Sequence, residues 1–222
     1  MKHAEFREQL YDQFARVGKS VCHGRRIELL ELLNQGEHTV ENLARESGLS
    51  VANTSRHLRQ MRQSGLVNSR KAGQHVHYSL ADPAMTEVVR LLREIAERRL
   101  TEVRKLVRNY LQESGSDTPL DSESLLKAQT EGKVTVLDVR PTSEYQSGHI
   151  SGAISLPLDK LLAGSDDLPR EKPVVVYCRG PYGILAREAI NHLAEEGIQA
   201  TRLADGLPEW RHAGHPVTEA SA

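Results

Sequence analysis

The sequence has few cysteines, few aromatic residues and no long apolar run. Its two cysteines, Cys22 and Cys178, stand far apart in a chain of 222 residues, which excludes a disulfide framework. No stretch of about 18 consecutive apolar residues occurs, so the sequence predicts no membrane-spanning helix. The N-terminal segment MKHAEFREQLYDQF is charged and amphipathic and lacks an apolar signal core, which favours a cytoplasmic location.

Positive and negative charges are divided unevenly along the chain. Residues 1–114 carry 19 Lys and Arg against 14 Asp and Glu, whereas residues 115–222 carry 10 against 16. Between positions 45 and 75 there are six basic residues and one acidic residue, a bias typical of a nucleic-acid-binding face. An ordinary solvated surface would show the same bias, so composition alone leaves both interpretations open.

The first half has the pattern of a winged helix-turn-helix. Helical periodicity covers residues 3–17, 25–33 and 39–48, and a further helix at 49–65 has Ser50 to cap it and Gly65 to end it. Two β-rich runs, 66–70 and 74–80, then flank a turn that contains glycine, which predicts a hairpin. A long helix from about Pro83 to Gln112 follows. Helices joined by a tight turn and followed by a two-stranded wing are typical of this fold.

The second half alternates strands and helices. Apolar strands are expected at 134–139, 153–157, 173–178 and 200–204, and a last short helix at 207–214. Such alternation predicts a mainly parallel sheet with helices on both faces. A polar stretch between the halves indicates a linker. We therefore expect one domain at residues 1–112, a linker at 113–120 and a second domain at 121–222.

The helix at 49–65 is the expected DNA-recognition helix. At about 100° per residue, Val51, Ser55, Leu58 and Met61 share its buried side. Arg can bond guanine bidentately and Asn or Gln can bond adenine, whereas wing residues would meet phosphates or the minor groove. The candidate DNA-binding residues on this helix and on the wing are Ser50, Asn53, Thr54, Arg56, His57, Arg59, Gln60, Arg70, Lys71, Gln74 and His75.

Three motifs make residues 5–112 resemble the ArsR/SmtB family of bacterial winged-helix repressors: SRHL at 55–58, SGLV at 64–67, and the wing from Gly73 to Tyr78. The resemblance implies a homodimer with its first and last helices at the interface, bound to an imperfect palindrome in double-stranded operator DNA. Helical spacing of apolar residues along the last helix favours a dimer over packing within one chain. These residues are Met85, Val88, Leu92, Ile95, Val103, Leu106 and Tyr110.

Metal-sensing members of that family often carry a Cys-x-Cys pair on the helix that here spans 40–47, but VENLARES has no cysteine. His75 and His77 share one face of a wing strand, where a structural or phosphate-contacting role is favoured over metal ligation. We therefore predict no metal site and no cofactor. Cys22, beside two arginines at a helix start, is interpreted as a buried inert cysteine, with a thiol of lowered pKa as the alternative.

The stretch VVVYCRGPYGILAREAI at 174–190 places Cys178 between an apolar strand and a helix. The loop after it predicts a cradle of backbone N–H groups that lowers the thiol pKa and receives an anion, with Gly180 and Gly183 supplying the φ values that the loop requires. The alternative is an apolar strand end that happens to be cysteine. Tyrosine phosphatases need an Arg six positions after the Cys, where this chain has Ile184, so phosphatase chemistry is disfavoured. Sulfur transfer needs only a thiolate and N–H donors for the persulfide.

Three further motifs make the second half resemble the rhodanese family: LDVRPTSEYQSGHISGAISLPL, VVVYCRGPYG and LADGLPEWRHAGHPV. The resemblance implies that Cys178 is the catalytic nucleophile and forms a persulfide. It also implies an anion-binding loop that holds the substrate, formed by Arg179, Gly180, Pro181, Tyr182 and Gly183.

Four residues of the first of these motifs are interpreted as mainly structural: Asp138, Arg140, Glu144 and His149. An ion pair between Arg140 and Glu144 is the simplest case. One position departs from the pattern, because rhodanese domains fused to such repressors often have a second cysteine where this chain has Gly183. Cys178 must then act alone or through another thiol.

Together these features predict two domains, a mainly α winged helix-turn-helix followed by an α/β rhodanese-like domain with a parallel sheet. The leading hypothesis is a repressor of sulfur-related genes whose Cys178 accepts sulfane sulfur, from a donor such as thiosulfate or polysulfide, and thereby weakens or tunes operator binding. The second hypothesis is a sulfurtransferase enzyme tethered to a DNA-binding dimer. The third is an arsenic- or metal-responsive repressor with an inert appendage. The helix at 84–112 is the element expected to couple the domains.

Overall fold

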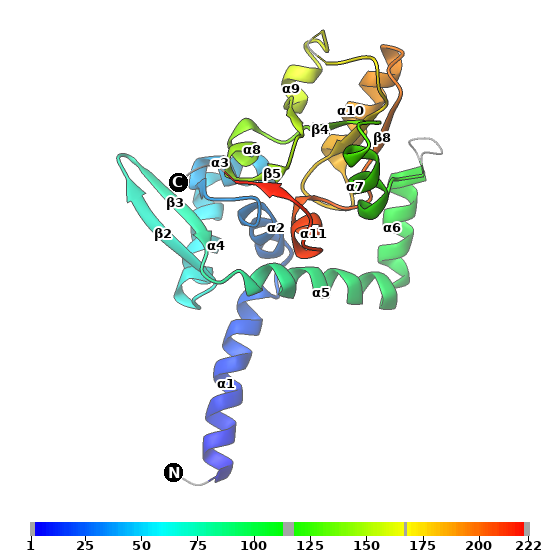
Figure 1. The fold of residues 1–222 in the computed structure, drawn as a ribbon. Coiled ribbons are helices and arrows are strands. Elements are labelled where there is room, and N and C mark those ends of the chain that lie inside the picture. Colours follow the sequence, from blue (N-terminus) through cyan, green and yellow to red (C-terminus); the bar gives the residue numbers. More distant parts are fainter. Residues whose placement is uncertain (1–2, 113–117, 167, 220–222) are drawn as a thin grey trace. The chain divides into compact units, whose positions relative to one another are not determined.

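The computed structural model describes residues 3–112, 118–166 and 168–219. The chain forms two compact units, Met1–Ile95 and Ala96–Ala222 (Figure 1). The boundary between the units falls before residue 112, and residues 113–117 of the expected linker lie outside the described residues. None of the described helices is long and apolar enough to cross a membrane.

The first unit begins with helices α1 (His3–Val21), α2 (Gly24–Leu33), α3 (Val40–Ser47) and α4 (Val51–Gln63). The expected caps are present: Thr39 Oγ1 accepts a hydrogen bond from the Asn42 amide, and Ser50 Oγ accepts one from the Asn53 amide. Gly48 ends α3 in the left-handed conformation. Apolar side chains of α2, α3 and α4 and of the following sheet form one core.

The expected hairpin is confirmed. Strands β2 (Val67–Ala72) and β3 (His75–Leu80) pair antiparallel around a turn in which Gly73 has a φ of 62°. A third short strand, β1 (His38–Thr39), pairs with β3, so the sheet order is β1-β3-β2. Figure 1 shows the β2–β3 hairpin as an extended wing after α4.

The prediction of one long helix from Pro83 to Gln112 is wrong. The structure has α5 (Ala84–Arg99) and α6 (Thr101–Gln112), with Leu100 between them. Neither glycine nor proline occurs between residues 84 and 112. The helical spacing of apolar residues continues across Leu100, so no local pattern indicates the break. The last residues of α5 and the whole of α6 belong to the second unit.

The second unit contains a four-stranded sheet of order β6-β4-β7-β8, in which every neighbouring pair is parallel. The strands are β4 (Thr135–Asp138), β6 (Ile154–Ser155), β7 (Val174–Tyr177) and β8 (Ala200–Arg202). A separate antiparallel pair joins β5 (His149–Ile150) to β9 (Val217–Thr218). The helices are α7 (Ser122–Thr130), α8 (Thr142–Ser147), α9 (Leu158–Leu161), α10 (Ile184–Glu195) and α11 (Leu207–His212).

Alternate residues of the buried strands face opposite sides of this sheet. Leu137, Val174 and Val176 belong to a core with α9 and α10, whereas Val136 and Val175 belong to a second core with α7 and α11. The expected parallel sheet with helices on both faces is therefore confirmed. This arrangement brings the carboxyl end of β7 and the first turn of α10 together, at the loop that holds Cys178.

Candidate functional site

Cys178 follows β7 directly and lies in the core formed with α9 and α10. Its side chain is 4% exposed, and its neighbours in that core include Val176 and Ala186. A buried cysteine in such a position behaves as a small apolar residue unless its surroundings also offer hydrogen bonds to the sulfur.

The loop of residues 179–183 and the first turn of α10 supply those hydrogen bonds. Backbone amides of Gly180, Ala186 and Arg179 are directed at the sulfur. Gly183 has a φ of 53° and stands at the N-cap of α10, where its amide donates to the Gly180 carbonyl over 3.2 Å. A side chain at position 183 would be strained in this conformation. The loop therefore closes around the sulfur with amide donors.

Of the two glycines expected to supply the φ values of the loop, Gly183 has a positive φ and Gly180 does not. The Gly180 backbone is instead packed against Gly206, which precedes α11. A Cβ atom at position 206 would lie 2.4 Å from the Gly180 nitrogen. The third sequence motif thus meets the Cys178 loop through a backbone contact that only glycine at 206 permits.

The expectation of a lowered thiol pKa is wrong. Burial raises the pKa of Cys178, and the three backbone amides and the charge of Arg179 oppose this effect without outweighing it. The thiol donates a long hydrogen bond to the Gly180 carbonyl, with 3.9 Å between sulfur and oxygen. Cys178 must therefore lose its proton before it can act as a nucleophile.

The negative charge of Glu144 favours the charged form of Arg140, as the predicted pair requires, and each of the two residues has a further ion-pair partner. Arg140 bonds Asp138, and both side chains are fully buried. Glu144, whose side chain is also fully buried, accepts hydrogen bonds from Arg179, with 2.9 Å between Oε1 and Nε. A buried carboxylate is stable only when a cation and hydrogen bonds compensate it, so Glu144 directs the Arg179 side chain towards the body of the unit.

Arg202 of β8 is a residue that the sequence reasoning missed. It is partly buried, and its Nη1 donates to the Pro181 carbonyl over 2.9 Å. A Cβ atom at Gly183 would meet the Arg202 Cδ at 3.8 Å and the Cys178 sulfur at 4.0 Å. Strand β8 lies beside β7 in the sheet, and this pairing carries Arg202 to the loop. The signal available in the sequence was the charged residue within a short predicted strand.

The remaining loop residue with a functional side chain is Tyr182. Its hydroxyl donates to Glu97 Oε1 over 2.7 Å, within the second unit. Arg187, in the first turn of α10, lies over the ring of Tyr110 of α6, with 4.4 Å from Cζ to the ring centroid. The Cys178 loop and the helix after it are therefore connected by side chains to the end of α5 and to α6.

On α4, the exposed face carries most of the residues predicted to read DNA. Asn53, Arg56, Arg59 and Gln60 are exposed, and the capping residue Ser50 is exposed as well. These side chains form one continuous polar face of the helix, as major-groove recognition requires.

Three predictions on α4 are wrong. Thr54 is fully buried and its hydroxyl donates to the Ser50 carbonyl over 3.1 Å, so it faces the core and not DNA. His57 is also buried, and burial, followed by the charge of His23, lowers its pKa. Val51, expected on the buried side, is exposed because it occupies the first position of the helix, beyond the edge of the core.

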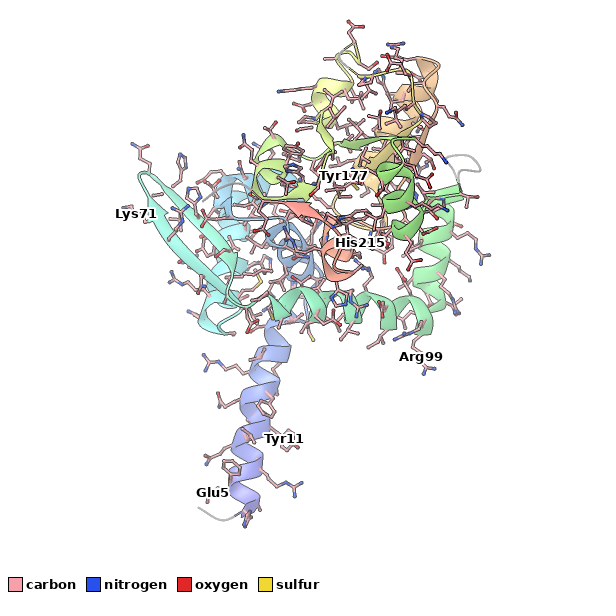
Figure 2. All side chains as sticks on the ribbon, viewed as in Figure 1. Glu5, Tyr11, Lys71, Arg99, Tyr177 and His215 are labelled. Carbon is pink, nitrogen blue, oxygen red and sulfur yellow. The ribbon has the colours of Figure 1, made fainter. Side chains whose placement is uncertain are left out.

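The predicted wing residues Arg70, Lys71, Gln74 and His75 are all exposed. Figure 2 shows Lys71 at the tip of the hairpin, pointing away from the protein. Arg70 forms hydrogen bonds with Glu37, one of them 2.8 Å long, and these bonds lower the pKa of the Glu37 carboxyl. The wing therefore combines free charge at its tip with charge that is neutralised at its base.

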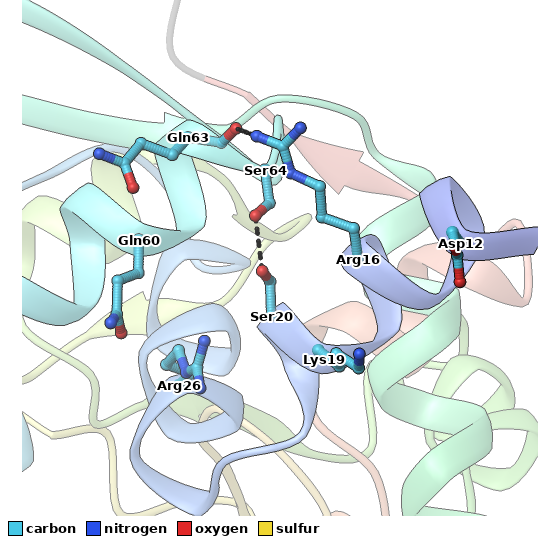
Figure 3. A pocket seen from close by; sticks show the side chains of 8 residues that line it. All are labelled: Asp12, Arg16, Lys19, Ser20, Arg26, Gln60, Gln63 and Ser64. Carbon is cyan, nitrogen blue, oxygen red and sulfur yellow. Dashed lines mark hydrogen bonds between the residues drawn. The ribbon is translucent and has the colours of Figure 1, made fainter. Parts of the chain in front are cut away.

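A pocket of about 540 Å³ opens between α1, α2 and α4 (Figure 3). It is polar, and two hydrogen bonds join its walls: Arg16 Nη2 donates to the Gln63 carbonyl over 3.1 Å, and the hydroxyls of Ser20 and Ser64 lie 2.6 Å apart. These bonds connect the C-terminal end of α4 to α1. The other lining residues are Asp12, Lys19, Arg26 and Gln60.

Cys22 is exposed in the short connection between α1 and α2, so the expectation that it is buried is wrong. The connection is too short to be covered by its own side chains. Within the part of the chain that the structure describes, no group of three or more His, Cys, Asp or Glu residues is arranged to hold a metal ion. His77 and His75 instead lie beside Glu37 and Glu41, at 3.1 and 3.7 Å.

Comparisons with known proteins match both halves of the chain. Residues 23–69 match the model of bacterial regulatory proteins of the arsR family, and residues 121–213 match that of the rhodanese-like domain. The HTH-type transcriptional regulator Rv0324 of Mycobacterium tuberculosis is 37% identical over 210 residues, which cover 95% of this chain and 92% of the regulator.

Two further relatives each match one half. The thiosulfate sulfurtransferase GlpE of Coxiella burnetii is 35% identical over 89 residues, which cover 40% of this chain and 80% of that enzyme. Among solved structures, the homodimeric winged helix-turn-helix DNA-binding domain of Mb0332 from Mycobacterium bovis has a TM-score of 0.42 and 32% identity, covering 46% of this chain and 94% of the domain.

Proposed function

This chain belongs to the arsR family of transcriptional regulators and carries a C-terminal rhodanese-like domain, and we propose that it regulates sulfur-related genes by sensing sulfane sulfur. In this function Cys178 accepts the sulfur, and the resulting persulfide changes the affinity of the winged helix for its operator. Repression by the sulfur-free protein is the favoured direction.

The observation that carries this proposal is the position of Cys178. Its sulfur lies at the end of β7, is almost fully buried, and faces three backbone amides. The amide donors directed at the sulfur offset part of the cost of burying a negative charge, which is the requirement for holding a persulfide anion away from water. Once the thiol has lost its proton, the thiolate attacks the outer sulfur of thiosulfate. A new S–S bond forms at Cys178 as the S–S bond of the donor breaks, and sulfite leaves with the electron pair.

DNA binding by a homodimer is the second part of the proposal. The exposed polar face of α4 suits the major groove, and Lys71 and the other wing residues suit phosphates. Helices α1 and α5 expose apolar side chains, among them Phe6, Tyr11, Phe14, Val88, Leu91, Leu92 and Ile95. Such surfaces support a second copy of the chain as the partner that covers them.

The contacts of the Cys178 loop support a route by which sulfur affects DNA binding. Tyr182 in this loop bonds Glu97 of α5, and the same helix begins in the first unit. A loop that moves to accommodate the extra sulfur would loosen this bond and alter the end of α5. A Glu97→Ala variant, which removes the acceptor, would then accept sulfur normally, but its DNA affinity would respond less to sulfur.

The decisive experiment measures DNA affinity and the sulfur content of each cysteine in the same samples. A duplex enriched from a random-sequence pool serves as the operator, and thiosulfate or polysulfide as the donor. Mass spectrometry should show a gain of about 32 daltons, the mass of one sulfur atom, at Cys178, accompanied by a change in DNA affinity. Cys178→Ser should lose both effects, whereas Cys22→Ser should retain them. A DNA response that persists in Cys178→Ser would refute the sensing role.

A sulfurtransferase enzyme is the second candidate function. The similarity of residues in the second half to the thiosulfate sulfurtransferase from Coxiella burnetii favours it. In that case the persulfide at Cys178 would pass its sulfur to cyanide or to a thiol in steady state, at a rate that DNA does not change. A single stoichiometric transfer without turnover would favour the sensor.

A further inference from the structure

We propose that Arg202 is the residue that selects anionic sulfur donors at Cys178, by binding the oxygen atoms of a thiosulfate-like group whose outer sulfur faces the thiolate. The inference rests on the proposed function and adds a residue that determines which donors react. It assigns donor recognition to a residue of β8, outside the loop from which the sequence led us to expect it.

The positions of the atoms support this role. A Cβ atom added at Gly183 would contact both the Cys178 sulfur and the Arg202 Cδ. Glycine at this position therefore leaves space between the thiol and the stem of Arg202. The guanidinium is anchored beside the loop, because Nη1 donates to the carbonyl of Pro181. A guanidinium has five donors, and others remain for an anion in the loop.

Two other arginines near the loop are paired with carboxylates. Arg179 bonds Glu144 and Arg140 bonds Asp138, and both carboxylates are fully buried. Among the described residues, no ion pair includes Arg202, and its guanidinium donates hydrogen bonds to the carbonyl oxygens of Pro181 and Leu203. Its positive charge is thus available to a donor anion.

The electrostatic surroundings of Arg202 also support a role in binding an anion. Burial lowers the pKa of Arg202, and the negative charges of Cys178 and Asp205 oppose this effect. A partly buried cation is stabilised by an anion in contact with it, and an anion entering a buried site needs a cation there. The buried loop would otherwise exclude a divalent donor such as thiosulfate.

A pair of alkylating reagents tests the charge of the site without requiring sulfur transfer. Iodoacetate is an anion and iodoacetamide is neutral, and both react with the same thiolate, so the ratio of their rates at Cys178 is independent of the thiol pKa. We expect Arg202→Gln to lower the iodoacetate-to-iodoacetamide ratio at Cys178 by about tenfold, the effect of one charge-assisted hydrogen bond. Arg202→Lys should retain much of the wild-type ratio. Arg170→Gln, which removes an exposed arginine of the same domain, is the matched control.

The controls separate charge from structure. If Arg202 only held the loop in place, Arg202→Gln would change both rates together and leave the ratio unchanged, and that result would overturn the proposal. The ratio at exposed Cys22 of the same molecules is an internal reference. If Arg202→Gln does not fold, the test uses the wild-type protein. Its iodoacetate-to-iodoacetamide ratio at Cys178 must then be higher in the folded protein than in the urea-unfolded chain. The ratio must also fall when salt is added.

Sulfur transfer is then measured in the same variants. Arg202→Gln should raise the thiosulfate concentration needed for half-maximal persulfide formation about tenfold, with a smaller effect on transfer from a neutral organic polysulfane. Equal effects on both donors would contradict donor selection. If wild-type Cys178 forms no persulfide with any donor, the proposed function fails, whereas the alkylation ratio still reports whether Arg202 makes an anion site.

Discussion

Gly206 lies directly against the backbone of the Cys178 loop: a Cβ atom there would be 2.4 Å from the Gly180 nitrogen and 2.5 Å from the Arg179 carbonyl carbon. Both neighbours are backbone atoms, so no side-chain rotation relieves the clash. The amide of Leu207, the next residue, also approaches the Cys178 carbonyl, at 3.4 Å. The start of α11 is therefore a fixed support for the loop around the sulfur.

Gly206→Ala should consequently displace the loop. We expect the second domain to lose about 1–3 kcal/mol of stability, as in other overpacked sites, and sulfur acceptance at Cys178 to slow at least about tenfold. Urea unfolding followed by the fluorescence of Trp210 measures the stability, because this buried residue is the only tryptophan in the chain. Gly24→Ala is the control, since a Cβ there would have nothing within 4 Å. Unchanged persulfide formation in Gly206→Ala would show that the loop tolerates the shift.

The raised pKa of Cys178 predicts the pH dependence of its reactions. Because burial favours the neutral thiol, the thiolate fraction at neutral pH is small and increases about tenfold per pH unit below the pKa. The rate of Cys178 alkylation by iodoacetamide should therefore continue to rise beyond about pH 8.5, the ordinary range for a cysteine. Peptide mapping after timed quenching follows this rate separately from that of Cys22. A plateau reached near pH 7 would mean that the amides outweigh burial.

The ion pair between Arg179 and buried Glu144 predicts a large stability effect that is independent of sulfur chemistry. Arg179→Ala removes the cation that is hydrogen-bonded to this buried carboxylate and leaves only the charge of Arg140 near it, so it should cost about 3–5 kcal/mol. Replacing both partners, in Arg179→Met with Glu144→Leu, should restore most of this loss, because no uncompensated charge remains. Unfolding followed by Trp210 fluorescence gives the coupling free energy of the pair. Additive losses in the double variant would argue against a direct pair.

The sequence predicted the architecture well because both halves carry strong periodic signals. The caps at Thr39 and Ser50, the wing hairpin and the βα alternation all follow from local spacing. The break at Leu100 has no such signal. It separates α5 from α6 without a glycine or proline.

The charges around the candidate site could not be assigned in the same way. Motif spacing identified Arg140, Glu144 and Arg179 as candidates. The pairing of these cations with carboxylates, however, depends on how β4, α8 and the Cys178 loop pack. Arg202 comes from a neighbouring strand and is brought to the sulfur only by the parallel pairing of β7 with β8. The sign of the thiol pKa shift depended on the depth of burial, which no local pattern gives.

At the DNA-binding wing, the bond between Arg70 and Glu37 predicts that one acidic residue restrains operator binding. Glu37 accepts hydrogen bonds from Arg70, so it neutralises charge on the wing that would otherwise face phosphates, and it also lies 3.1 Å from His77. Glu37→Gln should strengthen DNA binding about threefold to tenfold and make the dependence on salt steeper, by about one phosphate contact. Fluorescence anisotropy with a labelled duplex at several salt concentrations measures both quantities. In an Arg70→Gln background the same substitution should have little effect, and an equal gain there would place the action of Glu37 elsewhere on the wing.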